Sequence, residues 1–302
     1  MAVLPKLKEY YRPQKLSEAL ALLQRTDVHT VPLAGGTDLV SRKDALVEAV
    51  VDLQELGLDY IKEGDSFVRL GAVTTLQTMA TSPILRALAD GVVAEAAHNC
   101  AARIVRNMAT LGGTLISRAG TTDLPPTLLA LEAEVLLLAP DERRLSLAEF
   151  YVEENQLPGS GWLLTEVIIP IPGGSTGASL QRVSRTPSDR AIINVAAVVA
   201  IKDGVCQKAR AVAGGMGPVP VSLSTVAAFL EGKELSAERI DEAAKAVGEQ
   251  LDPPSDFLAS GEYRREMGIV LVRRALKEAR LRAQKPAPSS RGGDYEQSTS
   301  IR

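Results

Sequence analysis

Two double-glycine turns constrain this 302-residue chain more than any other feature of its sequence. They lie at Gly35-Gly36 and Gly112-Gly113, and each follows a segment that can be extended and precedes a small polar residue. Glycine permits a positive φ, and because it has no Cβ a ligand can approach its backbone closely. Successive N–H groups in such a turn form a nest for an anion, and two nests can hold one pyrophosphate from both sides. The pattern predicts a phosphate site between the loops; the alternative is a pair of tight structural turns.

Neither loop matches an established nucleotide-binding fingerprint. The first reads Leu33-Ala34-Gly35-Gly36-Thr37-Asp38 and the second Thr110-Leu111-Gly112-Gly113-Thr114. A Rossmann turn needs Gly-x-Gly-x-x-Gly, and a P-loop ends in Gly-Lys-Ser or Gly-Lys-Thr. The sequence therefore supports neither of these folds. Thr37 and Thr114 add hydroxyl donors beside the glycines.

The order of the predicted elements divides the chain into parts. The opening block, about 1–57, combines a helix carrying Leu20, Leu22 and Leu23 with strands at 29–33 and 50–53. The next block, 58–173, is expected to contain a strand at 67–73, helices at 83–98 and 123–131, and a buried strand at 133–139. Pro170, Pro172, Gly173 and Gly174 form a strong break, where we place a domain boundary.

Beyond this break, strands precede helices. The strands are predicted at 178–183, 192–201 and 206–213, and the helices at 223–231, 237–250 and 263–284. Strands first and helices afterwards indicate an α+β fold. The polar segment 285–302 is rich in Pro, Ser and Gly, so we expect a disordered tail there.

Composition excludes several functional classes. The net charge of −3 does not favour nucleic acid as the main partner. The longest apolar stretches, 133–139 and 195–201, are too short to span a bilayer, and the N-terminus has no apolar signal segment, so we expect a cytoplasmic protein. Cys100 and Cys206 are expected to be reduced core residues, with a disulfide as the alternative. We predict no metal site and no catalytic side chain.

Several segments together resemble one family. Residues 33–39 and 105–113 resemble the two FAD loops of the medium subunit of molybdenum-dependent carbon monoxide dehydrogenase and its relatives, which include the flavin domain of xanthine dehydrogenase. Further matches are Asp123-Leu124, Leu163-Leu164-Thr165, the turn from Ala213 to Pro218, Tyr263-Arg264-Arg265 and Arg273-Arg274-Ala275-Leu276. The similarity covers about Leu4 to Arg280.

The resemblance implies a fold and a site. It implies a two-part FAD-binding domain over 1–173, of the PCMH or vanillyl-alcohol-oxidase-like type, with parts at about 1–57 and 58–173. A smaller domain over 178–284 would carry a three-stranded antiparallel sheet with a helical bundle. The implied cofactor-binding residues are Leu33, Ala34, Gly35, Gly36, Thr37, Asp38, Thr110, Leu111, Gly112, Gly113, Thr114, Asp123, Leu164, Gln181 and Arg182.

Each of these residues has an implied role. The two loops would hold the FAD pyrophosphate, and Asp123 would accept a hydrogen bond from the adenosine end. Leu164 would pack near the flavin ring, and Gln181 or Arg182 would lie near its polar edge. The FAD would be non-covalent, because neither loop contains a His or Cys to attach it.

The implied function is electron transfer. The chain would accept electrons from 2Fe-2S clusters on a small iron–sulfur subunit, which receives them from a large molybdopterin subunit. It would pass them through FAD to NAD, a quinone or oxygen, within a dimer of heterotrimers. The alternatives are a freestanding FAD-dependent reductase or oxidase, and a scaffold subunit that has lost FAD.

Four residues depart from the family pattern. They are Cys100, Arg103, Thr114 and Arg190, which stand where relatives carry an aromatic residue, Gln, Asn and Tyr respectively. Because these differences change ring stacking and polarity, they leave the redox potential and the acceptor open.

Overall fold

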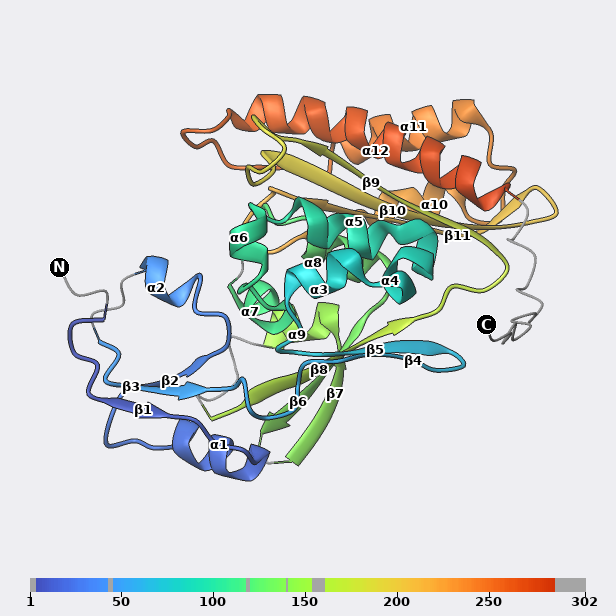
Figure 1. The fold of residues 1–302 in the computed structure, drawn as a ribbon. Coiled ribbons are helices and arrows are strands. Elements are labelled where there is room, and N and C mark those ends of the chain that lie inside the picture. The colour runs from blue at the N-terminus through green and yellow to red at the C-terminus, as the bar shows by residue number, and fades with distance from the viewer. Residues whose placement is uncertain (1–3, 43–45, 118–119, 140, 154–160, 286–302) are drawn as a thin grey trace, which may run out of the picture.

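The structure is a computed structural model that describes residues 4–42, 46–117, 120–139, 141–153 and 161–285. In these ranges the chain forms three sheets (Figure 1). The predicted disordered tail over 285–302 lies, apart from Lys285, outside the described residues.

The N-terminal part is built on a small parallel sheet. Its elements are β1 (Glu9–Tyr11), α1 (Leu16–Leu23), β2 (Thr30–Leu33), α2 (Leu39–Arg42) and β3 (Ala49–Asp52), and the strand order is β1-β3-β2. The apolar face of α1, with Ala19 and Leu23 fully buried, packs against Val51 and Leu53. The sheet thus holds the first glycine loop directly after β2.

The middle part contains a five-stranded antiparallel sheet. Its strands are β4 (Ile61–Glu63), β5 (Phe67–Gly71), β6 (Glu134–Ala139), β7 (Asp141–Ser146) and β8 (Leu163–Pro170), in the order β4-β5-β8-β6-β7. Its helices are α3 (Leu76–Thr81), α4 (Pro83–Ala87), η1 (Leu88–Gly91), α5 (Val92–Asn99), α6 (Arg103–Arg106), α7 (Leu111–Ile116), α8 (Leu124–Ala130) and α9 (Leu147–Glu153). The second glycine loop begins α7.

The single helix predicted over 83–98 is wrong. Ala89, Asp90 and Gly91 have φ values of 46°, 56° and 78°, which interrupt the helix. The break lets the Asp90 carboxylate accept a hydrogen bond from the N–H of Ala178 at 2.9 Å. A contact across 88 residues of sequence therefore overrides the local helical pattern.

The C-terminal part is an antiparallel sheet covered by helices. Its elements are β9 (Ser175–Val183), β10 (Ile193–Lys202), β11 (Val205–Gly214), β12 (Val221–Ser222), α10 (Ser224–Leu230), α11 (Ala237–Val247) and α12 (Gly261–Ala283). The three expected strands are present, and the two-residue β12 extends the sheet at the β11 edge. A two-residue strand leaves no pattern in the sequence.

This sheet is buried on both faces, as Figure 1 shows by the helices above and below it. Along β10, Val195, Ala197 and Val199 pack in one core with α12, while Ala196 packs in the core of the middle part. Continuous burial explains why the strand is a nearly unbroken apolar run. The sheet therefore joins the C-terminal part firmly to the part that carries the second glycine loop.

Candidate cofactor site

A cavity of about 490 Å³ lies where the three parts meet, which is within the usual size range for cofactor pockets. All but two of the predicted site residues line it. The exceptions are Leu111, which is fully buried in the core, and Gln181, which is half-buried on β9. The structure thus gathers residues that are up to 149 positions apart, from Leu33 to Arg182, at one cavity.

The two glycine loops touch each other. A Cβ built on Gly35 would lie 1.8 Å from the carbonyl oxygen of Met108, just before the second loop. The second loop is also held against 75–76, because Thr75 and Thr110 form an isolated antiparallel bridge and the N–H of Leu76 donates to the carbonyl of Ala109 at 2.8 Å. Glycine at position 35 is therefore required for the contact between the loops.

The first loop has free backbone donors. Gly36 has a φ of +69°, which turns the chain back on itself after β2. The N–H groups of Gly35, Gly36 and Thr37 donate no hydrogen bond to any residue in the described ranges. All three residues line the cavity and are half-buried. Adjacent unpaired donors in a half-buried turn fit an anion such as a pyrophosphate.

The second loop is different. Its N–H groups are already bonded, from Leu111 to the Thr74 carbonyl, from Gly112 to the Ala72 carbonyl, and from Gly113 and Thr114 to the Thr110 side-chain and backbone oxygens. The expectation that the second loop also forms a nest of free N–H groups is wrong, because these donors are used to begin α7 and to fasten it to 72–74. What this loop offers the cavity is a surface without side chains at Gly112 and Gly113.

A buried polar cluster forms one wall of the cavity. Asp123, immediately before α8, accepts a hydrogen bond from the Asn194 amide at 2.5 Å, and its other oxygen lies 3.2 Å from Nε of Arg182. Burial raises the pKa of Asp123, while Arg182, Asn194 and Asn99 oppose this rise. Both carboxylate oxygens thus face protein groups, and the predicted contact of Asp123 with adenosine stays a prediction.

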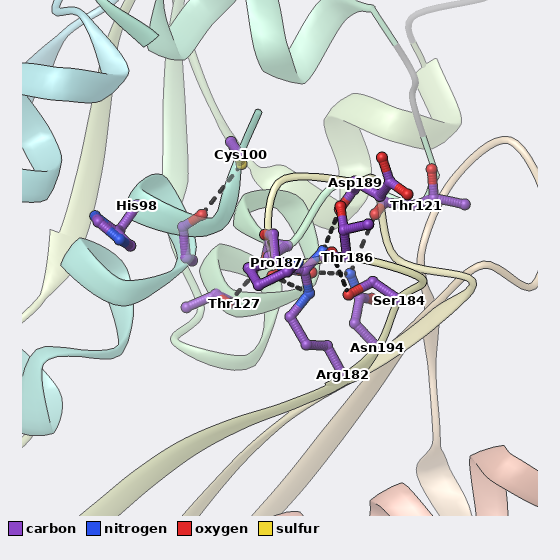
Figure 2. Close-up of polar contacts among 12 residues, drawn as sticks. His98, Cys100, Thr121, Thr127, Arg182, Ser184, Thr186, Pro187, Asp189 and Asn194 are labelled. Atoms are coloured by element: carbon purple, nitrogen blue, oxygen red, sulfur yellow. Dashed lines mark hydrogen bonds and ion pairs between the residues drawn. The ribbon is translucent and has the colours of Figure 1, made fainter. Parts of the chain in front are cut away.

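Arg182 also holds a loop. Its terminal nitrogens donate to the carbonyls of Pro187, at 3.1 Å, and Asp189 (Figure 2). The side chain therefore lies between Asp123 and the connection from β9 to β10. Its predicted place at the polar edge of a flavin stays a prediction.

Another part of the cavity lining is apolar. Leu163 and Leu164 on β8 are almost fully buried, and Trp162 precedes them. Cys100 also lines the cavity, and burial raises the pKa of its thiol to about 12. A wall of this kind suits a planar aromatic group and excludes water from it.

Sequence reasoning did not assign Arg42 and Asn99 to the site, yet both line the cavity. Arg42 forms an ion pair with Asp38 at 2.6 Å. Because oppositely charged residues four positions apart are neighbours on a helix, their spacing in the sequence could have indicated this pair. Nothing in the sequence around Asn99 marked it. In the described ranges no group of three His, Cys, Asp or Glu side chains could hold a metal ion, and no helix there is long and apolar enough to cross a membrane.

Comparisons with known proteins agree with this geometry. The family described as FAD binding domain in molybdopterin dehydrogenase matches residues 5–172, and the CO dehydrogenase flavoprotein C-terminal domain matches residues 178–279. The chain is 29% identical to the carbon monoxide dehydrogenase medium chain of Afipia carboxidovorans, covering 93% of this chain and 99% of that one. It is 31% identical to subunit alpha of the 6-hydroxypseudooxynicotine dehydrogenase complex of Paenarthrobacter nicotinovorans, over 91% and 95% of the two chains.

A solved structure is also similar. Carbon monoxide dehydrogenase from Hydrogenophaga pseudoflava, in a form that lacks the Mo-pyranopterin moiety of its cofactor, superposes with a TM-score of 0.85 at 27% identity. The match covers 92% of this chain and 99% of that chain.

Proposed function

The chain belongs to the family of FAD-binding domains in molybdopterin dehydrogenases, and from this membership we propose that it is the electron-transfer subunit of a molybdenum hydroxylase or dehydrogenase. It is an FAD-dependent oxidoreductase subunit of the carbon monoxide dehydrogenase type. The observation that supports the proposal most directly is that Gly35, Gly36 and Thr37, whose N–H groups have no partner among the described residues, line a cavity with an apolar wall.

The residues of the cavity fit FAD. The first loop would donate its free N–H groups to the pyrophosphate, and the side-chain-free surface at Gly112 and Gly113 would let the cofactor lie close to α7. Leu163 and Leu164 would pack against the ring. Exchange of one or two electrons is the chemistry that bound FAD supplies. No acid or base from the chain is needed for that step.

The proposal requires partner subunits. An iron–sulfur cluster normally takes four Cys ligands, and this chain has two cysteines, both buried in different parts of the fold. We therefore place the 2Fe-2S clusters on a smaller subunit and molybdopterin on a larger one, consistent with the designation of a relative as a medium chain. A dimer of heterotrimers, and NAD, a quinone or oxygen as acceptor, complete the proposal.

The substrate would be selected outside this chain. The chain is about equally similar, at 29% and 31% identity, to subunits of two enzymes that are named for different substrates, carbon monoxide and 6-hydroxypseudooxynicotine.

We also propose a division of the chain into two domains. An FAD-binding domain would cover 1–173, with parts at about 1–57 and 58–173, and a C-terminal domain would cover 178–284.

The first test is the absorbance spectrum of the purified chain and the identity of the cofactor that heat releases. We expect nearly one non-covalent FAD per chain, and iron–sulfur and molybdenum subunits that co-purify from the native source. A colourless chain that cannot be reconstituted with FAD would overturn the proposal in favour of a scaffold. Efficient turnover of a small substrate by the isolated flavoprotein would favour a freestanding oxidase or reductase.

A further inference from the structure

One charged residue of the cavity lining has no partner in the described part of the chain. Arg190 lines it, is exposed, and forms no hydrogen bond or ion pair with any described residue. The other charged lining residues are paired, Asp38 with Arg42 at 2.6 Å and Asp123 with Arg182 at 3.2 Å. The guanidinium of Arg190 is thus the free cation of the described lining.

The backbone on both sides of Arg190 is held in place. On one side, the Asp189 carbonyl accepts a hydrogen bond from Arg182. On the other side, Ala191 is fully buried, and the N–H of Ile192 donates to the Val183 carbonyl at 2.7 Å. The exposed side chain therefore extends from a fixed point on the cavity rim.

Arg182 connects this loop to the buried polar cluster around Asp123. One guanidinium reaches Asp123 before α8 and the carbonyls of Pro187 and Asp189 in the loop, as Figure 2 shows for the loop contacts. Only 15% of the Arg182 side chain and 1% of the Asp123 side chain are exposed. The pair is therefore shielded from solvent, and its position sets that of the loop.

We propose that the β9–β10 loop supplies a cation to the cofactor site. Arg182 positions the loop so that Arg190 binds an anionic group of FAD. Arg182 is a positioning residue, and Arg190 is the residue that touches the cofactor. FAD has two sources of negative charge. One is the pyrophosphate, and the other is the reduced flavin, which takes up two electrons and one proton and retains a negative charge at N1. A guanidinium matches either anion through charge-assisted hydrogen bonds.

The inference rests on the binding of FAD in this cavity and makes a separate claim about Arg190. A hydrogen bond to a charged group corresponds to about a 10- to 100-fold change in affinity. If the anion is the pyrophosphate, both redox states of FAD lose this affinity when the cation is removed. If the anion is the reduced flavin, only the reduced state of FAD binds more weakly. Each tenfold loss of affinity for the reduced state then lowers the two-electron midpoint potential of the bound FAD by about 30 mV.

The test measures the dissociation constant of FAD from the full-length apoprotein, oxidised in air and reduced with dithionite under anaerobic conditions. Arg190→Gln is expected to weaken binding about 10- to 100-fold in one or both states. Arg185→Gln is the matched control, because Arg185 lies in the same loop, carries the same charge, pairs with Asp189 and is not part of the cavity lining. Unchanged affinity in both states for Arg190→Gln, or an equal loss for Arg185→Gln, overturns the inference.

Arg182→Lys tests the positioning role. Lysine keeps a positive charge beside Asp123 but cannot hold both loop carbonyls with one planar group. We expect Arg182→Lys to weaken FAD binding in the same redox state as Arg190→Gln, and to add little when the two changes are combined. Fully additive effects would mean that Arg182 acts independently of Arg190. Failure of the wild-type chain to bind FAD would instead refute the proposed function.

Discussion

Replacing Gly35 with alanine tests whether the contact between the two loops builds the cofactor site. The new Cβ would lie 1.8 Å from the Met108 carbonyl oxygen and 2.6 Å from its carbon, and both atoms are backbone. Real Cβ atoms essentially never approach other atoms closer than 3.0 Å, so the loops must separate by at least 3.0 − 1.8 = 1.2 Å. From the sequence alone, a side chain at position 35 would be expected to weaken FAD binding by filling the phosphate nest. In the structure, it would weaken FAD binding because it displaces the loops.

The expected effect on stability is moderate, while the effect on FAD is large. Met108 is 57% exposed, so the segment just before the second loop can move towards solvent without opening the core. Overpacking of this kind destabilises by about 1–3 kcal/mol. The separation of 1.2 Å displaces the two loops relative to each other, so the N–H groups of Gly35, Gly36 and Thr37 would no longer reach a pyrophosphate that lies against Gly112 and Gly113. Each charge-assisted bond contributes about 1.5–3 kcal/mol, so losing two weakens FAD binding by roughly 10² to 10⁴-fold.

The assay compares three glycines in one experiment. At Gly112 a Cβ would lie 3.0 Å from the Ala72 carbonyl oxygen and 3.1 Å from the Ala72 Cβ, so alanine there requires a smaller shift. At Gly173 a Cβ meets nothing within 4 Å, which makes Gly173→Ala the control. The FAD-to-protein ratio and the FAD dissociation constant are measured for each variant, with thermal unfolding of the apoprotein to follow the fold.

FAD affinity is expected to fall most for Gly35→Ala, less for Gly112→Ala and not at all for Gly173→Ala. A Gly35→Ala protein that folds and keeps stoichiometric FAD with unchanged affinity would refute the reasoning, because the loop contact would then have no role in the site. Loss of FAD by the Gly173→Ala control would show that the measurement reports general damage.

Two further predictions concern buried groups. Asp123→Asn leaves the Arg182 guanidinium without its counter-ion, while Asn194 keeps a partner. The free energy of unfolding, measured in urea, should therefore fall by about 3 kcal/mol, the lower end of the range for an unpaired buried charge. A fall of less than roughly 0.5 kcal/mol would contradict the pairing. Burial raises the pKa of Cys100 to about 12 and of Cys206 to about 11, so at pH 8 only roughly one thiol in 10³ to 10⁴ is ionised. A thiol reagent at pH 8 should therefore label neither residue until the protein is unfolded, and rapid labelling of the native chain would show that one of them is accessible.

Local chemistry made much of the fold predictable. The proline and glycine cluster over 170–174 separates β8 from β9, because such residues interrupt regular structure. The apolar run of β10 was recognisable as a strand, and the long final helix by its spacing of apolar residues. In contrast, β7 was missed, because its exposed, charged residues follow no alternating pattern. Charged residues are common on edge strands, where only pairing with β6 reveals the strand.

The sequence by itself identified the two glycine loops, and most of the residues it implied line one cavity. Glycine pairs before a small polar residue are local features, and their conformational freedom is the same in any fold. Only the tertiary structure decided that the first loop keeps its donors free while the second does not. Whether an N–H is free depends on which carbonyls lie nearby, and those of Ala72 and Thr74 come from 40 residues upstream of Gly112 and 37 upstream of Leu111. The same holds for Arg190, which has no charged partner among the described residues because the fold pairs the other charged residues of the lining with one another.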